Sequence, residues 1–245
     1  MILCLDCGNS RLKWGVRDGS GWRASGALLL VDIAQVAQKL PTDCSPASII
    51  GCNVAGDERA CQIEAQIETA LDRRIEWINA TDEQCGVVNG YENPASLGAD
   101  RWAALIAARA MQPGAAVVVL AGTATTIDVL DANGRHQGGV ILPGISLMAS
   151  ALAANTAQLP QASGRYRDLP QNTHDAIVSG AIQATLGAIQ RMFALLPSQK
   201  ETICLLSGGA AAVLQPYLAA PCRRVDTLVL DGLACIAVTP RSDPA

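Results

Sequence analysis

The N-terminal stretch combines an acid, a turn of small residues and a base. Asp6 follows an apolar run that begins at Ile2, the turn residues 8–10 are Gly-Asn-Ser, and Lys13 lies in a second apolar run. Because Gly and Asn tolerate positive φ, this pattern predicts a β-hairpin. An acid for a divalent cation, a turn that approaches phosphate closely and a neutralising base suit a nucleoside triphosphate. A surface hairpin with an incidental acid is the alternative that this stretch alone leaves open.

A second hairpin of the same kind is predicted in the C-terminal half. The apolar run Ala116–Ala121 leads into the small-residue turn 122–125, Gly-Thr-Ala-Thr, and Thr126–Leu130 reads as the return strand. We interpret this as an internal duplication of the strand, turn and strand unit, although the identity between the halves is slight. Two such hairpins are able to face each other across a cleft and grip a phosphate chain from both sides.

Strands and helices alternate along the rest of the chain, which is typical of an α/β protein with helices covering a sheet. Gly, Asn and Pro residues make the stretch 85–97 an expected irregular loop, and 159–172 an expected polar one. We expect two halves, 1–113 and 114–245. The other predicted strands are 22–30, 48–54, 74–79, 135–142, 202–206 and one near Val225, and the predicted helices are 32–40, 57–71, 98–111, 145–154, 173–196 and one from about Asp231.

Composition narrows the functional class. The chain has 245 residues, 50% of them hydrophobic, and a net charge of -4, which favours a globular protein with a substantial core. No cluster of Lys and Arg is present, so nucleic acid is not an expected partner. No basic segment precedes the first apolar run and no apolar stretch reaches the roughly 18 residues of a membrane span, so we expect a cytoplasmic protein without a membrane partner. The nine cysteines are then expected to be mostly reduced thiols, and Cys4 and Cys7 lack the second pair of a zinc site.

Three loops in order resemble the nucleotide site of a known superfamily. Asp6–Ser10, Gly122–Ala124 and Ser207–Gly209 stand where the actin, sugar-kinase and chaperone ATPase superfamily places two phosphate loops and an adenosine loop. The resemblance implies a duplicated actin-like (ribonuclease H-like) ATPase fold of class α/β, with two halves that each contain a mixed sheet flanked by helices. No G-x-G-x-x-G is present, so a Rossmann dinucleotide site is excluded.

Further motifs narrow the resemblance to one family. Gly90–Arg101, Gly122–Asp128 and Gly138–Gly144 closely resemble the type III pantothenate kinases, also called Bvg accessory factor proteins, and the similarity runs from residue 2 to about 236. This resemblance implies transfer of the γ-phosphoryl group of ATP to the primary hydroxyl of pantothenate, the first committed step toward coenzyme A. It also implies a homodimer whose substrate pocket is built across the dimer interface.

The resemblance implies which residues contact ATP. Asp6 would orient the phosphates that carry Mg²⁺, and Ser10 replaces a commoner threonine but keeps the hydroxyl. The implied ATP-binding residues are Asp6, Cys7, Gly8, Asn9, Ser10, Arg11, Leu12, Lys13 and Thr123. Asp128 lies on the return strand near the second loop, and we expect it only to support that loop.

The resemblance also implies a pantothenate pocket with Asp100 as the general base. A primary alcohol is a poor nucleophile, and a carboxylate within hydrogen-bonding distance can accept its proton as the phosphoryl group transfers. The alternative is an acid that merely complements a helix N-terminus capped by Ser96. The implied substrate-binding residues are Tyr91, Gly98, Ala99, Arg101 and Thr173; without the resemblance, Arg101 reads as a surface cation and Thr173 as an ordinary N-cap.

One position departs from the family pattern. The family usually has an aspartate two residues before the Gly-Thr of the second phosphate loop, and this aspartate binds a monovalent cation, K⁺ or NH₄⁺; here the position is Leu120. Either another oxygen substitutes, or this chain does not use the cation. The same departure favours a non-catalytic accessory or regulatory protein as an alternative to the kinase. A kinase for another small hydroxylated acid is a third possibility.

Overall fold

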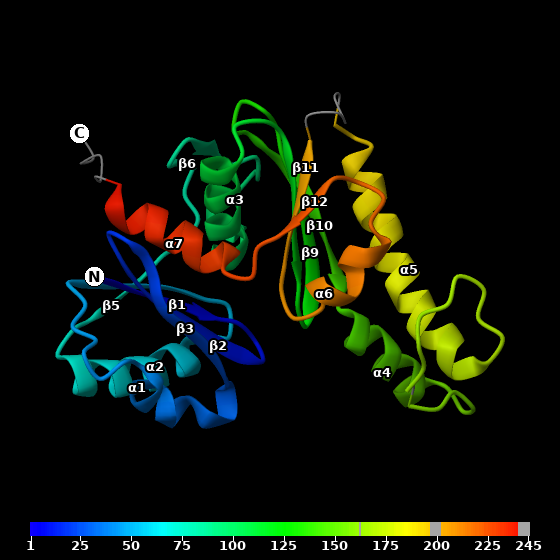
Figure 1. Ribbon diagram of the computed structural model, residues 1–245, viewed down its shortest axis with the longest axis horizontal. Helices are drawn as coiled ribbons and strands as arrows, with labels where there is room; N and C mark the ends of the chain where they lie inside the picture. Colours follow the sequence, from blue (N-terminus) through cyan, green and yellow to red (C-terminus); the bar gives the residue numbers. More distant parts are fainter. Residues whose placement is uncertain (162, 197–201, 240–245) are drawn as a thin grey trace. The chain divides into compact units, whose positions relative to one another are not determined.

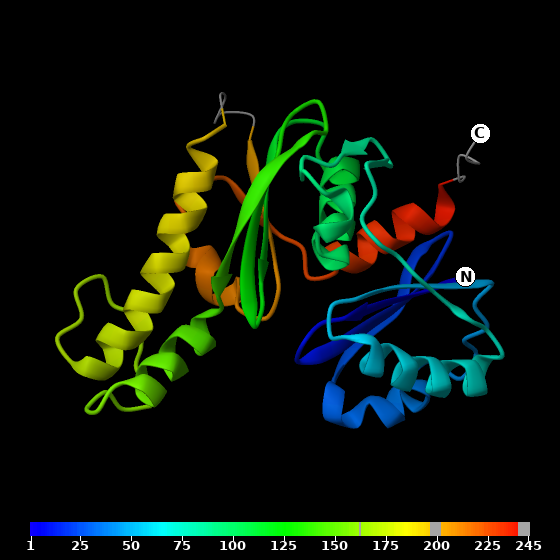
Figure 2. The same cartoon turned by 180° about the vertical axis from the view of Figure 1, so that it is seen from behind.

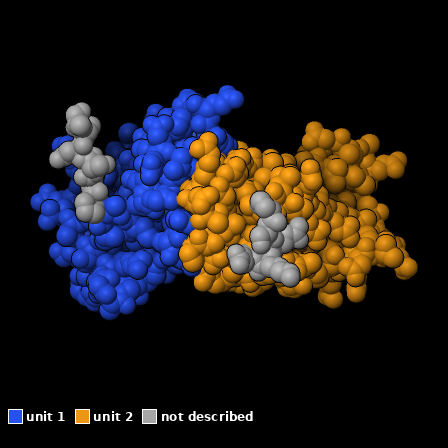
Figure 3. All heavy atoms as spheres, turned by 90° about the horizontal axis from the view of Figure 1, so that it is seen from above, with its two compact units in different colours: residues 1–111, 227–245 blue, residues 112–226 orange. Residues whose placement is uncertain are grey.

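The computed structural model describes residues 1–161, 163–196 and 202–239, which divide into two compact units (Figure 3). Unit 1 consists of Met1–Met111 and the C-terminal segment from Thr227, and unit 2 is Gln112–Asp226. The first boundary lies two residues from the predicted one. The predicted half 114–245, however, included the C-terminal helix, which belongs to unit 1. Residues 240–245 of that predicted half lie outside the described residues.

The sheet of unit 1 has the order β3-β2-β1-β4-β5. β1 pairs antiparallel with β2 and parallel with β4, and the strand-to-strand meander β1-β2-β3 is the predicted N-terminal hairpin with one strand added. The strands are β1 (Ile2–Cys7), β2 (Arg11–Asp18), β3 (Gly21–Leu29), β4 (Ser48–Asn53) and β5 (Ile75–Trp77).

Helices cover both faces of this sheet (Figure 1). The 3₁₀ helix η1 (Leu30–Gln35), α1 (Val36–Lys39) and α2 (Asp57–Leu71) lie on one face, and α7 (Leu228–Val238) lies on the other, where it also packs against α3 (Ala99–Met111). Leu3, Leu5 and Cys7 of β1 are buried in the core with α2. Because strand side chains alternate, Asp6 points to the opposite face of the sheet, the one that carries α7.

Unit 2 repeats the plan of unit 1, with sheet order β10-β9-β8-β11-β12 and the same pattern of antiparallel and parallel pairs. The predicted duplication is therefore confirmed, and Leu120 is the fifth residue of β8 as Asp6 is the fifth of β1. The strands are β8 (Ala116–Ala121), β9 (Ala124–Leu130), β10 (His136–Pro143), β11 (Ile203–Ser207) and β12 (Cys222–Arg224).

The longest helix of unit 2 lies along its sheet (Figure 2). α5 (Thr173–Phe193) packs on β8 and β9 and buries Ile182, Leu186 and Ile189 there, while α4 (Ile145–Asn155) contacts α5. Two short helices, α6 (Ala211–Leu214) and the 3₁₀ helix η3 (Gln215–Tyr217), follow β11. Within the described residues, no helix combines the length and apolarity needed to cross a membrane.

Two predicted segments differ from the structure. The predicted helix 32–40 begins as the 3₁₀ helix η1, for which no side chain caps the N-terminus. The expected loop 85–97 contains structure: β7 (Val87–Val88) forms a small hairpin with β6 (Glu83–Gln84), which directly precedes the loop, and η2 (Pro94–Ser96) follows. The turn of this hairpin is Cys85-Gly86, with φ of 51° and 76°, which matches the type I′ turns of two-residue hairpins. Two-residue strands are too short to leave a periodic pattern.

Gly232 sets how closely α7 approaches α3, so its substitution tests this packing. A Cβ atom at Gly232 would overlap the carbonyl oxygen of Ala103. We expect Gly232→Ala to lower the free energy of unfolding by about 1–3 kcal/mol, measured by urea denaturation, because the backbone must move to admit the methyl group. Gly180→Ala in α5, where the added atom meets open space, is the matched control and should stabilise the chain by up to about 1 kcal/mol. Equal effects of the two substitutions would contradict this account of the helix contact.

Candidate functional site

The turn between β1 and β2 exposes backbone and small polar side chains. The Gly8 amide donates to the Arg11 carbonyl oxygen at 3.1 Å, which closes the turn, and Asn9 and Ser10 are exposed. Cys7 and Leu12 are fully buried in the core of unit 1. Any contact that these last two residues make with a ligand at the turn must therefore come from their backbone.

A buried carboxylate stands at the base of this turn. Asp6 is 6% exposed, and the Nζ of Lys13, its register partner on β2, lies 3.5 Å from Asp6 Oδ2. The Cys52 thiol of β4 donates to Asp6 Oδ1 at 3.7 Å. Burial raises the pKa of Asp6, while the Lys13 charge and the Cys52 hydrogen bond act in the opposite direction. The carboxylate is thus held from both neighbouring strands.

Asp100 lies in the first turn of α3, and its carboxylate is within electrostatic reach of the same thiol as Asp6. Burial raises the pKa of Cys52 well above its usual value, and the charges of Asp6 and then Asp100 raise it further. The charges of both predicted site carboxylates thus act on one buried thiol of unit 1.

Asp100 is an acid at the start of a helix, as the alternative interpretation expected. Its Oδ1 accepts the backbone N–H of Arg101 at 2.8 Å, which satisfies a first-turn amide. Gly98 leaves room for this carboxylate, since a Cβ there would lie 2.8 Å from Asp100 Oδ1. Ser96 is not the expected cap, because its hydroxyl donates to the Asn93 carbonyl oxygen at 2.6 Å instead.

Arg101 is a buried residue and not a surface cation. Arg101 is only 4% exposed. Its Nη1 donates to the Tyr91 hydroxyl at 2.7 Å, and its guanidinium lies 5.4 Å from the centre of the Tyr91 ring. Ala99, two residues earlier on α3, is buried as well. A buried guanidinium beside a phenol can recognise a carboxylate or an amide oxygen of a ligand.

Asn89 organises the loop that carries Tyr91, and the sequence analysis missed it. This buried amide donates from Nδ2 to the carbonyl oxygens of Thr81 and Pro94, and its Oδ1 accepts the backbone N–H of Tyr91 at 3.0 Å. A polar residue beside Val88 in a Gly-rich stretch was a weak signal for this role. The three bonds hold Thr81, Tyr91 and Pro94 around one buried amide.

The second predicted phosphate loop is a two-residue turn, Gly122-Thr123, shorter than expected because β9 already begins at Ala124. The Gly144 amide donates to the Thr123 carbonyl oxygen at 2.8 Å, and a Cβ at Gly144 would overlap the Gly122 carbonyl oxygen. The motif around Gly144 therefore supports this turn from the start of α4. Thr123 itself is exposed.

Leu120 lies between two hydroxyl residues in one row of the unit 2 sheet. Ser207 of β11 and Thr126 of β9 are its register partners, so the three side chains share a face. Both hydroxyls are buried without a hydrogen-bond partner. The corresponding row of unit 1 contains Cys52, Asp6 and Lys13, so the two units differ in charge at equivalent positions.

Hydrogen bonds define the surroundings of two predicted residues of unit 2. Asp128 forms a buried 2.8 Å contact with Nε2 of His136 on the neighbouring strand, and its support of the second loop stays a prediction. The N-cap of α5 is Asn172, whose Oδ1 accepts the Asp175 amide, so Thr173 is not the cap. Thr173 is exposed and lines a hollow of about 510 Å³ together with Leu152, Leu159, Pro170, Gln171, Asn172, Ala176 and Ile177.

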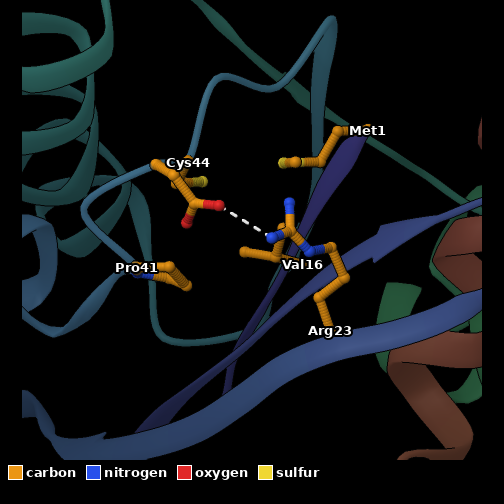
Figure 4. Close-up of a pocket in the computed structure, with 6 residues that line it drawn as sticks. Met1, Val16, Arg23, Pro41 and Cys44 are labelled. Atoms are coloured by element: carbon orange, nitrogen blue, oxygen red, sulfur yellow. Dashed lines mark hydrogen bonds and ion pairs between the residues drawn. The ribbon is translucent and has the colours of Figure 1, made fainter.

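A smaller hollow in unit 1 is unrelated to these residues. It measures about 90 Å³ and is lined by Met1, Val16, Arg23, Pro41, Asp43 and Cys44, with Arg23 Nη2 2.7 Å from Asp43 Oδ2 (Figure 4). Met1 precedes β1 and Val16 pairs with Leu3, so this hollow lies at the end of the hairpin away from its turn. It is also smaller than the few hundred Å³ typical of ligand sites.

A Mg²⁺ ion fits the donors at Asp6, whereas a metal centre made by the protein alone does not. The described part of the chain contains no cluster of three or more His, Cys, Asp or Glu side chains able to hold a metal ion. Mg²⁺ in phosphoryl-transfer sites is commonly held by one or two carboxylates together with the substrate phosphates. The single buried carboxylate of Asp6 beside an exposed turn meets that requirement.

Comparisons with known proteins agree with this arrangement. A sequence profile of the type III pantothenate kinases matches residues 2–195. The type III pantothenate kinase of Aromatoleum aromaticum is 52% identical, covering 97% of this chain and 98% of the relative, and that of Dechloromonas aromatica is 44% identical, covering 97% and 99%.

Solved structures share the fold at low identity. A conserved putative Baf family transcriptional activator from Campylobacter jejuni superposes with a TM-score of 0.64 at 21% identity, covering 96% of both chains. A putative 2-dehydro-3-deoxygalactonokinase from Sinorhizobium meliloti gives 0.60 at 15% identity, covering 97% of this chain and 98% of the other. The predicted duplicated actin-like fold is thereby confirmed.

The Asn89 hydrogen bonds predict a measurable effect of its removal. Asn89→Ala leaves the Tyr91 amide and two carbonyl oxygens without their partner, and we expect a loss of roughly 1–3 kcal/mol in stability. Hydrogen–deuterium exchange should accelerate at Tyr91 and its neighbours. Asn89→Asp, which keeps the acceptor for Tyr91 N–H but loses both donated bonds, should retain more protection at Tyr91 than Asn89→Ala. Unchanged exchange in the alanine variant would show that the loop is held by other contacts.

Proposed function

We propose, since the chain belongs to the type III pantothenate kinase family, that it transfers the γ-phosphoryl group of ATP to the primary hydroxyl of pantothenate. The structural observation that supports this activity best is the buried Asp6 carboxylate, which lies 3.5 Å from Lys13 Nζ at the base of an exposed glycine turn. The candidate base Asp100 belongs to the same unit. The product is 4'-phosphopantothenate, an intermediate on the way to coenzyme A.

Asp100 is the general base of this proposal. Its carboxylate would accept the proton of the pantothenate hydroxyl as that oxygen attacks the γ-phosphorus, and the bond from phosphorus to the bridging oxygen of ADP breaks. The Arg101 amide, donating to Asp100 Oδ1, orients the carboxylate. Gly98 supports the reaction indirectly because it admits the carboxylate beside the helix start.

ATP would contact two loops of the chain. In unit 1 the backbone from Cys7 to Leu12 and the side chains of Asn9, Ser10 and Arg11 are available at the turn, with Asp6 and Lys13 at its base. In unit 2 the exposed Thr123 would contact ATP. Mg²⁺, when bound with ATP, would neutralise phosphate charge next to the Asp6 carboxylate.

Pantothenate would bind beside the start of α3. Arg101, buried and bonded to Tyr91, is suited to its carboxylate or amide oxygens, and Gly98 and Ala99 shape the adjoining backbone. Thr173 would contact the substrate from the start of α5. Because it lines its own hollow in unit 2, its assignment rests on the family pattern alone.

We further propose that the chain forms a homodimer. Strand β10 and helix α4 expose the large apolar side chains Val140, Ile141, Leu147 and Leu152, with 63% of Ile141 accessible. Between Arg135 and Arg165 the sequence contains no Asp, Glu, Lys or Arg. A two-fold interface places identical surfaces against each other, so an uncharged apolar surface pairs with its copy without repulsion.

Asp100→Asn tests the assignment of the base. If proton acceptance contributes its usual factor, kcat for pantothenate phosphorylation should fall by about 10² to 10⁴, or roughly 3 to 5 kcal/mol of transition-state stabilisation. Asp57→Asn is the matched control, because Asp57 also lies in the first turn of a helix but in α2. It should leave kcat unchanged. A D100N enzyme with more than about a tenth of the wild-type kcat would show that Asp100 serves only the helix.

Leu120 predicts that the reaction does not depend on K⁺ or NH₄⁺. Its aliphatic side chain offers no ligand, and the neighbouring Ser207 and Thr126 hydroxyls are neutral, so the row lacks the anionic oxygen expected for a cation. We expect equal turnover in potassium, ammonium and choline salts at constant ionic strength. Leu120→Asp should make turnover respond to K⁺. Strong activation of the wild-type enzyme by K⁺ would mean that other oxygens supply the site, while no turnover in any salt would contradict the kinase activity itself.

A further inference from the structure

Two cysteines of unit 2 lie opposite each other on neighbouring parallel strands. Cys204 of β11 is the register partner of Cys222 on β12. Neighbouring strands are about 4.8 Å apart, which is within the range of roughly 4.4–6.8 Å that separates the Cα atoms of disulfide-linked residues. Both side chains pack with the hydrophobic core of unit 2, so they point to the same side of the sheet. Both are free thiols in this structure.

The two thiols differ in burial and acidity. Cys204 is fully buried, whereas Cys222 is partly exposed. A hydrogen bond between them raises the pKa of Cys204, with burial acting in the same direction, and lowers the pKa of Cys222. Burial is the main cause that raises the pKa of a thiol to about 12 for Cys4 and about 11 for Cys7, and at Cys222 the hydrogen bond outweighs this effect. Cys222 is therefore both accessible and favoured as a thiolate, the form that reacts with oxidants.

We propose that Cys204 and Cys222 are an oxidation site that closes to a reversible disulfide under hydrogen peroxide. The Cys222 thiolate attacks one peroxide oxygen, the O–O bond breaks, and the leaving hydroxide takes a proton from solvent, which leaves a sulfenic acid on Cys222. The Cys204 sulfur then attacks the Cys222 sulfur as the S–O bond breaks, and the departing hydroxide takes the Cys204 proton to form water. Two thiols are oxidised, and one peroxide is reduced to two molecules of water.

The partner thiol is what distinguishes this pair from a single reactive cysteine. A sulfenic acid next to a second thiol condenses to a disulfide, whereas one without such a neighbour can proceed to the irreversible sulfinic acid. A dithiol reductant restores the pair by thiol–disulfide exchange.

The disulfide would enclose residues 205–221. This segment contains the end of β11, the Ser207–Gly209 turn and the helices α6 and η3. The turn is held closely against β8, because the Ala210 amide donates to the Ala121 carbonyl oxygen at 3.0 Å and Gly208 has φ +100°. A cross-link between two residues that are already neighbours constrains the unfolded chain more than the folded one. Oxidation should therefore raise the melting temperature of the protein.

The test uses the full chain treated with hydrogen peroxide, alkylated, and digested without reduction. We expect mass spectrometry to find a peptide pair joined through Cys204 and Cys222, lighter by two hydrogen atoms than the two reduced peptides. The oxidised protein should melt at a higher temperature than the reduced protein, and dithiothreitol should reverse both changes. Neither measurement involves ATP or pantothenate, so its failure is distinct from failure of the proposed kinase activity.

Matched variants define the outcome. Cys222→Ser should abolish the cross-link and the shift in melting temperature, while Cys61→Ser, which removes an exposed thiol of α2, should leave both unchanged. Peroxide that converts Cys222 only to sulfinic acid, or links it to a different cysteine, would overturn the proposal. Wild-type protein in which Cys222 stays reduced while Cys61 is oxidised would overturn it as well. The wild-type result is decisive even if the Cys222→Ser variant does not fold.

Discussion

The ion pair between Asp6 and Lys13 is the constraint on which the candidate site depends. A carboxylate that is only 6% exposed loses hydration, and burial accordingly raises the pKa of Asp6. Lys13 on one neighbouring strand and the Cys52 thiol on the other oppose that cost. The register of β1 with β2 and β4 is what brings both partners to the carboxylate. The pairing of the strands in unit 1 therefore fixes the chemical surroundings of the Asp6 carboxylate.

The duplicated sheet gives the two units equivalent positions with different chemistry. The row that holds Cys52, Asp6 and Lys13 in unit 1 corresponds to Ser207, Leu120 and Thr126 in unit 2. Leu120 needs no charged partner, and the residues beside it are hydroxyls in place of a thiol and an amine. A duplication therefore conserves backbone geometry while each copy of a row acquires its own electrostatics.

Much of the fold was predictable because most of its strands and helices are long enough to show the period of their apolar residues. Helix α2 was predicted with both ends correct, since apolar residues such as Ile63 and Ile67 recur on one face. The hairpin β6-β7 was missed, because strands of two residues have no period. The role of Asn89 was missed because its hydrogen-bond partners, Thr81, Tyr91 and Pro94, meet it only through the path of the folded chain. Arg101 reads as a surface cation by type, and only its packing against Tyr91 makes it a buried one.

The sequence by itself determined the two sheets, the position of the turns and the family, because alternation, small-residue turns and motif order are local properties of the chain. Only the tertiary structure decided which distant residues meet. It returned α7 to unit 1, where Gly232 allows contact with α3. It also put the Cys52 thiol beside Asp6, and Cys204 opposite Cys222. These pairings depend on strand order and helix packing, which bring together residues far apart in the chain and so leave no signal in any single stretch of it.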